Sequence, residues 1–479
     1  MNNLDYLDDL RVYMKKLEEM GELKIIDGAD WNLEIGTICE GVSWKGNPFA
    51  ILFDNIKDYP KGFRLLTNAM RYNWKRMAFL EGLIPAETPM EQIKMYKEHG
   101  KNTRRIPPQR VDWAPFMENI DEGENVDIYK FPTPKYHEKD GGRYIGTGCV
   151  CILRDPDSGY INLGVYRVMI LDRSSLVIYV SPGKDGRVII EKYARKGDTC
   201  PIAITFGQSP LLYRSASKTC LFGDGEYGYA GGLRGKAIEV VEGKFTGLPI
   251  PISAEIAIEG EILPGKFAEE GPFGEWTGYY GSGKRPEPVI DIKRVMYRND
   301  PIMLADPPFK PLFEAADLGR TAQIWKEVEA AGLPGVKGVW IHGSGGPHLL
   351  KVISIKQSYP GHAVQAGMLV SQCKSGSYCN RYTIVVDEDV DPSNTQEVLW
   401  AMCTRSDPEN DIHLVKRSLS TPLDPIIPPW KKKDECFNSR VVIDATRPYE
   451  WRDQFPEVNE SDPVLRKKVM EKWWKVLFG

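Results

Sequence analysis

The spacing of apolar residues divides the chain into three successive patterns. From residue 4 to residue 99, helical periods alternate with short apolar runs, which is typical of an α/β arrangement. From Tyr144 to Tyr297 one strand-like segment follows another, with turns rich in Gly, Pro, Asp and Ser between them. After Pro301 the α/β pattern returns. The sequence therefore predicts three domains, residues 1–115, 116–305 and 306–479, and the middle one is expected to be an antiparallel barrel or sandwich.

Individual elements follow from the same patterns. The expected helices are residues 4–20, 74–83, 90–99, 188–195, 322–331, 396–404 and 462–478. The expected strands are residues 23–26, 50–53, 145–153, 160–171, 176–180, 200–206, 236–241, 252–262, 289–297, 349–354 and 382–386. The last helix ends in an apolar cluster that includes Trp473, Trp474 and Phe478. Such a cluster is expected to dock on another domain or subunit and not to face water, so it predicts an oligomerisation helix.

Composition limits the classes of function. Of the 479 residues, 42% are hydrophobic and 27% are charged, which is ordinary for a soluble globular protein with a large core. The net charge is -4 without a long basic tract, so neither nucleic acid nor an anionic membrane is an expected partner. Segment 1–10 is acidic and unlike a signal peptide, and no apolar run approaches the ~20 residues of a membrane helix. The nine cysteines form no zinc-like CxxC pair, and we expect a cytoplasmic protein.

The segment Glu270-Gly-Pro-Phe-Gly-Glu275 is the first candidate for chemistry. Its Pro fixes φ and its glycines permit positive φ, so the chain is expected to turn sharply. If the flanking segments pair as a hairpin, the two carboxylates face each other, with Cβ atoms roughly 5 Å apart. Like charges that close hold a proton near neutral pH or a cation between them. The arrangement predicts a proton-handling site, and a surface hairpin with two solvated acids is the alternative.

Arg167 lies in an otherwise apolar strand pattern over residues 161–170. Because side chains alternate along a strand, it shares a face with four apolar residues. These are Ile161, Leu163, Val165 and Met169. A buried guanidinium needs a carboxylate partner, whereas an Arg at a strand end can extend its charge into water. With Glu270 and Glu275, Arg167 would form a unit that binds an anionic substrate and delivers a proton beside it.

A second group of candidate ligand-binding residues lies in a glycine-rich segment, residues 222–235, and in the preceding residues 214–218. Its glycines let a backbone approach a ligand, and Glu226 and Arg234 supply charge. The preceding Arg214-Ser-Ala-Ser-Lys218 has hydroxyls and cations of the kind that hold phosphate. Glycine-rich segments of β proteins are equally typical of plain turns, so the pattern alone does not decide between them.

Taken together, these segments resemble the UbiD-type decarboxylases, which use prenylated FMN. The matching motifs are Asn162-x-x-x-x-Arg167, Glu226 before Ala230-Gly-Gly-Leu-Arg-Gly235, Glu270-Gly-Pro-Phe-Gly-Glu275 with Gly278-Tyr-Tyr280, and Val386-Asp-Glu-Asp-Val-Asp391. Further matches are Asp140-Gly-Gly-Arg-Tyr144, Leu399-Trp-Ala-Met-Cys-Thr-Arg405 and Thr421-Pro-Leu-Asp-Pro425. They occur in the order of the family over residues 130–425.

The resemblance implies an α+β fold with a central split β-barrel that binds the flavin, flanked by N- and C-terminal α/β domains. Arg167, Glu270 and Glu275 would be the catalytic network, with Glu275 as proton donor and Arg167 orienting the substrate carboxylate. The implied reaction is a carboxy-lyase reaction, the reversible non-oxidative decarboxylation of an aromatic, heteroaromatic or conjugated α,β-unsaturated acid through a covalent prenylated-FMN adduct.

The resemblance also implies the cofactor contacts. Asn162 and Glu226 would help hold a divalent ion, Mn²⁺ or Mg²⁺, that bridges to the cofactor phosphate. Asp185 stands where the family commonly has a histidine ligand, and an all-oxygen set suits these hard ions. An exposed turn residue is the alternative for Asp185. The loop with Ser215 and Ala216 would lie beside a K⁺ ion.

Fewer motifs point to the residues that line the substrate pocket. Thr421 and Leu423 fall where family members often line the ring pocket, and Lys356 is a further candidate contact of the cofactor phosphate. The implied partners are a small carboxylic acid and a flavin prenyltransferase, with a homodimer or homohexamer as the assembly. Two other functions stay open on the sequence: an FMN-dependent reductase, because split barrels also bind FMN, and a non-catalytic auxiliary subunit of a carboxylase complex.

Overall fold

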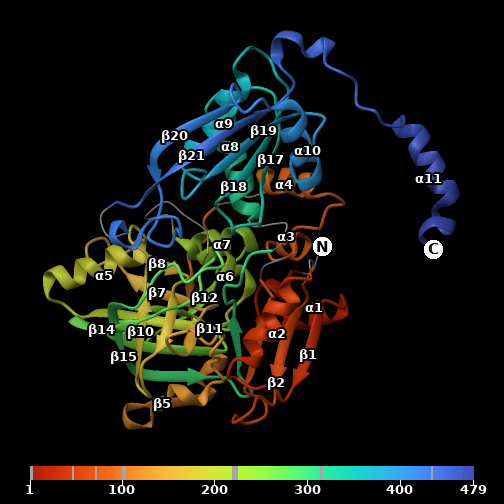
Figure 1. The fold of residues 1–479 in the computed structure, drawn as a ribbon. Coiled ribbons are helices and arrows are strands. Elements are labelled where there is room, and N and C mark those ends of the chain that lie inside the picture. The colour runs from red at the N-terminus through yellow and green to blue at the C-terminus, as the bar shows by residue number, and fades with distance from the viewer. Residues whose placement is uncertain are drawn as a thin grey trace.

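The fold is seen in a computed structural model that describes residues 4–45, 48–70, 73–99, 104–217, 225–312, 317–432 and 435–479. The strands of these residues form four sheets. The three largest follow one another through the N-terminal, central and C-terminal parts of the chain (Figure 1).

The N-terminal sheet has the strand order β1-β2-β3-β16. Its strands are β1 (Leu23–Asp27), β2 (Ala50–Asp54), β3 (Arg64–Thr67) and β16 (Ile302–Ala305). The helices of this part are α1 (Leu10–Glu19), α2 (Glu34–Ser43), α3 (Trp74–Phe79) and α4 (Pro89–Glu98). Helix α1 begins later than expected, because the Asp9 carboxylate accepts hydrogen bonds from the backbone N–H groups of Arg11 and Val12 and so caps it.

The central sheet contains most of the strands that the sequence pattern predicts. They are β5 (Asn119–Glu122), β6 (Tyr144–Gly146), β7 (Val150–Arg154), β8 (Ile161–Gly164), β9 (Arg167–Ile170), β10 (Ser175–Tyr179), β11 (Cys200–Phe206), β14 (Ile256–Glu270) and β15 (Arg285–Tyr297). The strand order is β6-β9-β10-β15-β14-β11-β7-β8, with β5 paired to β15.

The connection between β8 and β9 shows that this sheet is curled. Strand β8 is at one end of the strand order and β9 is next to the other end, yet only Val165 and Tyr166 separate them. From Gly164 to Arg167 the chain spans at most about 11 Å, so the two ends of the sheet must lie close together. The expected fold class, a central split barrel flanked by α/β parts, is thereby confirmed.

Two expected strands are each divided in two. Residues 145–153 form β6 and β7, and residues 160–171 form β8 and β9. Strand β6 pairs with β9 at one end of the sheet, whereas β7 pairs with β8 and β11 at the other. Because the halves of each segment join opposite ends of the sheet, each strand has to break between them.

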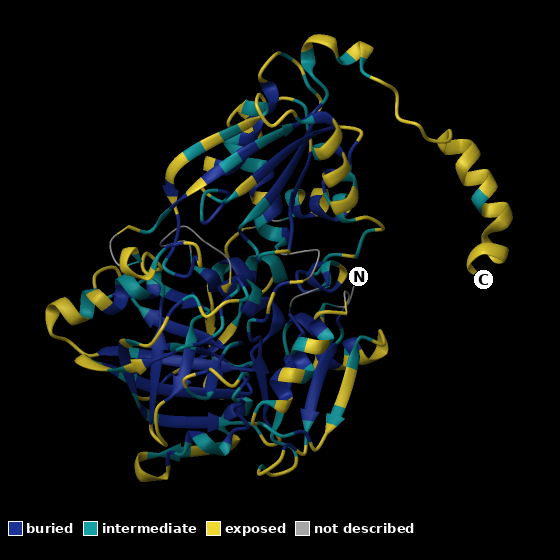
Figure 2. Ribbon diagram, in the orientation of Figure 1, coloured by how far each residue is buried: buried dark blue, intermediate teal, exposed yellow. Residues whose placement is uncertain are grey.

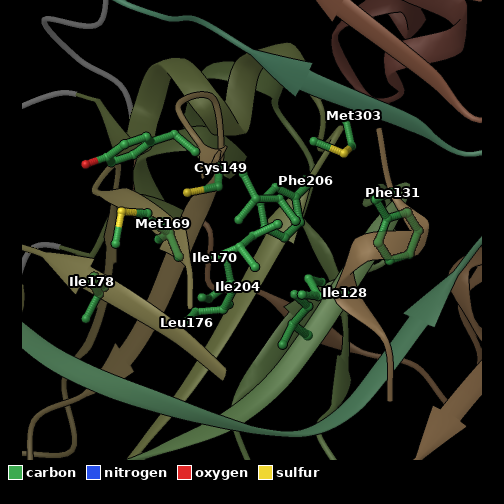
Figure 3. Close-up of a cluster of buried hydrophobic side chains, with 14 of the residues drawn as sticks. Ile128, Phe131, Cys149, Met169, Ile170, Leu176, Ile178, Ile204, Phe206 and Met303 are labelled. Carbon is green, nitrogen blue, oxygen red and sulfur yellow. The ribbon is translucent and has the colours of Figure 1, made fainter. Parts of the chain in front are cut away.

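The curled sheet encloses a hydrophobic core. Figure 3 shows Ile170, Leu176, Ile204 and Phe206 packed together there, and all four are buried. Figure 2 shows the same burial along most of the central strands. Around the sheet lie α5 (Asp185–Lys196), α6 (Pro210–Ala216), α7 (Glu226–Arg234) and a small sheet of β4 (Gln109–Arg110), β12 (Glu239–Glu242) and β13 (Pro249–Pro251).

The C-terminal sheet has the strand order β17-β18-β19-β21-β20. Its strands are β17 (Val336–Ile341), β18 (Leu350–Ile355), β19 (Tyr382–Asp387), β20 (Ile412–Leu419) and β21 (Phe437–Ala445). Helices α8 (Leu318–Ala330), α9 (His362–Gln372) and α10 (Thr395–Arg405) pack on it. The sequence pattern missed α9 and the strands β17, β20 and β21.

The last helix, α11 (Pro463–Phe478), forms as expected but lies away from the rest of the chain (Figures 1 and 2). All its residues except Met470 are exposed, including Trp473, Trp474 and Phe478. The expectation that it docks on another domain of this chain is therefore wrong for the described residues, and docking on another subunit stays a prediction. None of the helices in the described ranges is long and apolar enough to cross a membrane.

Candidate active site

Arg167, the first residue of β9, is held between two carboxylates. Its Nε donates to Glu270 Oε1 at 2.8 Å and its Nη2 donates to Glu270 Oε2 at 2.7 Å, so this pair is bidentate. Its Nη1 donates to Glu275 Oε1. Glu270 is fully buried and Glu275 is 7% exposed. The structure thus brings together the three residues that the resemblance joined, and their catalytic roles remain predictions.

The two carboxylates do not face each other across a tight hairpin, as the sequence pattern suggested. Glu270 is the last residue of β14 and pairs in register with Arg285 of β15, while Glu275 lies in the connection between these strands. Within that connection the Glu275 carbonyl accepts a hydrogen bond from Gly278 N–H at 2.8 Å, which folds the segment back. Burial excludes the alternative of two solvated acids on a surface hairpin.

Arg167 also differs from its expected setting, because the strand breaks two residues before it and is not continuous over residues 161–170. It does lie at a strand end, but its side chain is only 11% exposed and does not extend into water. Its guanidinium lies over the ring of Tyr179 on the adjacent strand β10, 4.4 Å from the ring centroid. Cation–π contact and two ion pairs therefore fix its orientation.

Burial and the neighbouring charges act in opposite directions on the pKa of the Glu275 carboxyl. Burial raises the pKa of the Glu275 carboxyl above its ordinary value, whereas the Arg167 and Arg285 guanidiniums oppose that rise. Burial also acts against the charge of Arg167, but Glu275 and Glu270 outweigh it and raise the pKa of Arg167. A carboxyl with a raised pKa, held beside a cation, is suited both to release and to take up a proton.

Tyr144 is a further contact of the group that the sequence reasoning did not single out. Its hydroxyl donates to Glu270 Oε1 at 2.8 Å, and its ring stacks on Phe273 with centroids 3.8 Å apart. Tyr144 ends the matching motif Asp140-Gly-Gly-Arg-Tyr144, which is the one signal that could have pointed to it. Tyr179 and Arg285 carry no such signal, because only the pairing of the strands places them at the site.

A second polar group lies around the hydroxyl of Tyr166. This hydroxyl donates to Asn162 Oδ1 at 3.0 Å and accepts from the backbone N–H of Gly186 at 3.1 Å. Gly186 follows Asp185, which begins α5 and is half-buried, so Asp185 is not an exposed turn residue. Burial raises the pKa of Glu226 to about 7, with a smaller contribution from the charge of Asp185. Asn162, Asp185 and Glu226 therefore lie in one region.

This region does not contain a metal site built from charged and sulfur ligands alone. In the described part of the chain no three side chains of His, Cys, Asp or Glu lie close enough to hold a metal ion. An oxygen set with Asn162 as its third member would fit a hard divalent ion, since that preference requires only oxygen donors. Metal ligation by Asn162, Asp185 and Glu226 therefore stays a prediction.

Helix α6 and the segment that follows it contain the residues expected beside K⁺ and phosphate. Ser215 and Ala216 are both buried in α6, and the Ser215 hydroxyl is a buried polar atom without a hydrogen-bond partner among the described residues. A water or an ion would satisfy such an orphan. Lys218 and residues 222–224 lie outside the described residues. Glu226–Arg234, expected as a glycine-rich loop, is helix α7. The helix lies close to the Ile106 carbonyl because Gly231 has no side chain: a Cβ atom there would be 2.6 Å from that oxygen.

Loops of the C-terminal sheet cover the connection that carries Glu275. Thr421 and Leu423 are buried, and a Cβ atom on Gly281 would lie 2.6 Å from the Leu423 carbonyl oxygen. Lys432 Nζ donates to the Gly281 carbonyl. The structure does not bring Lys356 to this group: Lys356 is exposed and follows the last residue of β18, at the end of the strand opposite to these loops.

Comparison with known proteins agrees with this geometry. Models of the N-terminal, Rift-related and C-terminal domains of 3-octaprenyl-4-hydroxybenzoate carboxy-lyase (UbiD) match residues 14–95, 109–311 and 315–445. A phenolic acid decarboxylase of Bacillus subtilis is 31% identical over 97% of this chain and 98% of its own. A pyrrole-2-carboxylic acid decarboxylase of Pseudomonas aeruginosa is 30% identical over 98% of each.

A solved structure shows the same fold. An evolved dimeric form of the UbiD-class enzyme HmfF from Pelotomaculum thermopropionicum, in complex with prFMN, superimposes with a TM-score of 0.80. It is 28% identical, and the match covers 96% of this chain and 98% of that one. The resemblance inferred from the motifs is confirmed over almost the whole length, and the chain belongs to the UbiD family of carboxy-lyases.

Proposed function

We propose that the protein is a prenylated-FMN-dependent decarboxylase that removes CO₂ reversibly from an aromatic, heteroaromatic or conjugated α,β-unsaturated carboxylic acid. The observation that carries this proposal is the guanidinium of Arg167, ion-paired to the two buried carboxylates of Glu270 and Glu275. Support comes from relatives whose names state the decarboxylation of phenolic acids and of pyrrole-2-carboxylic acid. The matches cover 97% and 98% of this chain, so they are not confined to one domain.

Arg167 would orient the carboxylate of the substrate. A guanidinium has five N–H groups. Nε makes one contact with Glu270, Nη2 contacts Glu270 and Ser282, and Nη1 contacts Glu275. Among the described residues one N–H of Nη1 has no partner, and it would remain for the substrate. A cation that is fixed before the substrate arrives loses little entropy on binding it.

Glu275 would move the proton. After CO₂ leaves, the carbon that carried it must receive a hydrogen, and a carboxyl with a raised pKa is suited to supply it. Glu270 would hold Arg167 in place, because it binds the guanidinium through both oxygens and also accepts from the Tyr144 hydroxyl. Thr421 and Leu423, both buried and the latter lying against Gly281, would border the ring of the substrate.

The cofactor would supply what no side chain can. Prenylated FMN, when bound, provides the electron sink for the charge left by the departing CO₂. Asn162, Asp185 and Glu226 would hold a Mn²⁺ or Mg²⁺ ion, and Ser215 and Ala216 would lie beside a K⁺ ion. The fit is supported by the unpartnered Ser215 hydroxyl and by the prFMN that the HmfF structure contains. A flavin prenyltransferase would deliver the cofactor, and a homodimer or homohexamer in the cytoplasm is the proposed assembly.

The two rival functions explain less of the site. An FMN-dependent reductase has no use for an arginine between two buried acids, and oxidation of NADH by the flavin-loaded protein would reveal it. A non-catalytic auxiliary subunit has no reason to keep all three side chains in contact. Both rivals predict no release of CO₂ from any acid.

The test is co-expression with a flavin prenyltransferase, followed by mass spectrometry of the bound flavin and a screen for CO₂ release from phenolic and pyrrole carboxylic acids. Glu275→Gln should abolish release and leave the visible absorbance of the bound cofactor intact. Glu269→Gln is the matched control, because Glu269 precedes Glu270 at the end of the same strand but its side chain is 74% exposed. Normal turnover by the Glu275 variant would contradict the proposed role.

A further inference from the structure

An alternating series of charges leads from Glu275 to the protein surface. Beyond Arg167 and Glu270 it continues to Arg285, whose Nε lies 3.8 Å from Glu270 Oε2 and 3.1 Å from Glu287 Oε1. Glu287 Oε2 accepts from Arg187 at 3.0 Å, and Arg187 also pairs with the exposed Glu191 at 2.8 Å. Acids and guanidiniums strictly alternate along this series.

The series is a product of strand pairing. Arg167 and Tyr179 are register partners on β9 and β10, and Glu270 and Arg285 are register partners on β14 and β15. Because the strand order runs β9-β10-β15-β14, these residues lie on four successive strands. The ring of Tyr179 lies between two guanidiniums in this arrangement, 4.4 Å from Arg167 and 3.6 Å from Arg285.

Charge balance shows what Arg285 contributes. Glu270 and Glu275 are both buried, and Arg167 alone would leave the group with one net negative charge. A buried net charge is unfavourable, and the group would take up a proton to remove it. Arg285 brings the nearest further positive charge on the sheet, and its buried Nε and Nη2 atoms make no hydrogen bond among the described residues. Its orientation is instead fixed by the Tyr179 ring and by Glu287.

We propose that Arg285 is a positioning residue that supplies the second positive charge of the site and favours the ionised form of Glu275 before substrate binds. Glu287 moderates that charge, because it pairs with Arg285 from the same strand. The inference rests on the proposed function and deepens it. An ionised Glu275 has no proton to share with the substrate carboxylate, so that carboxylate stays charged and can leave as CO₂. It concerns the resting protein and can be tested without cofactor.

The other groups that face Glu275 do not replace Arg285. Arg167 and Glu270 are its direct neighbours, Lys432 acts on it from the loops of the C-terminal sheet, and the Ser282 hydroxyl lies 3.5 Å from Glu275 Oε1. The remaining neighbours, Tyr144 and Tyr179, are neutral phenols. Lys432 is a further cation, but it lies in the loops of the C-terminal sheet, where its ammonium donates to the Gly281 carbonyl and burial lowers its pKa. Arg285 is the second guanidinium of the group.

The experiment is a titration of Glu275 by infrared difference spectroscopy on the cofactor-free protein, with Glu275→Gln to assign the carboxyl band. Arg285→Gln is expected to raise the apparent pKa of Glu275 by about one pH unit, as the loss of a nearby opposite charge does. Arg285→Lys keeps the charge and is expected to stay near the wild-type value. Glu287→Gln removes the acid that partly neutralises Arg285, so it is expected to lower the pKa of Glu275.

Arg294→Gln is the matched control. Arg294 is on the same strand, and its Nη1 lies 3.7 Å from the fully buried Glu259, which resembles the distance from Arg285 to Glu270. It lies outside the alternating series, so its variant should leave the Glu275 titration unchanged. An unmoved titration in Arg285→Gln, or an equal shift in Arg285→Lys, overturns the inference. If Arg285→Gln does not fold, Glu287→Gln decides alone, and an unchanged or raised pKa there overturns it.

Discussion

The strongest consequence of the buried group concerns stability when its cation is removed. Arg167→Met replaces the guanidinium by an apolar side chain of similar length and leaves Glu270 and Glu275 buried without their main partner. Breaking a buried pair in this way costs about 3–5 kcal/mol of folding free energy at neutral pH. A cooperative unit of 150–250 residues loses about 2–4 °C per kcal/mol, so the melting temperature should fall by about 6–20 °C.

The stability lost in Arg167→Met should depend on pH, and the direction of this dependence follows from the pKa of Glu275. Burial already raises the pKa of Glu275, and the variant loses Arg167, the strongest group that opposes this rise. The folded pKa then lies further above the unfolded value of about 4.3. Such a carboxyl binds more protons in the folded state, so its stabilising contribution is present in acid and is lost as pH rises through the folded pKa. Each proton contributes at most about 1.4 kcal/mol per pH unit.

The assay is thermal unfolding of Arg167→Met and wild type at several pH values between about 5 and 8, all above the ordinary carboxyl pKa. The difference in melting temperature should be small at the acid end and largest at the alkaline end. The double variant Arg167→Met/Glu275→Gln is the control, because a neutral amide needs no cation and should recover part of the loss. A deficit that is equal at all pH values, or a double variant that recovers nothing, would refute the reasoning.

Four further predictions follow from the same geometry. Tyr144→Phe removes a hydrogen bond to a buried carboxylate, worth about 1.5–3 kcal/mol, so turnover should fall about tenfold or more while cofactor absorbance persists; wild-type turnover would count against it. Asp185→Ala should lower the Mn²⁺ content of the purified protein measured by elemental analysis, and a full metal content would remove Asp185 from the ligand set. Thr421→Phe should shift activity towards smaller acids, and an unchanged substrate profile would exclude Thr421 from the pocket. Deletion of residues 459–479 should reduce the assembly mass measured by light scattering, because α11 is exposed along its length; an unchanged mass would show that it holds no subunit.

Local patterns located many elements, and their errors have physical causes. Strand β11 has the expected bounds, because its apolar run is bounded by clear turn residues. Strand β14 continues to Glu270 although the pattern ended it at residue 262, since Pro264 and Gly265 resemble a turn but lie in an irregularity of the pairing with β15. That extension matters for function, because it is what brings Glu270 next to Arg285.

The sequence alone determined which residue types are present and in which order, and that was enough to identify the family, the curled sheet and the arginine with its two acids. These features depend on residues that can be compared one position at a time. The tertiary structure alone decided that Glu270 pairs with Arg285, that Tyr179 lies between two guanidiniums, and that Lys356 is remote from the site. Such contacts depend on the register and curvature of strands far apart in sequence, which no local pattern of side chains specifies.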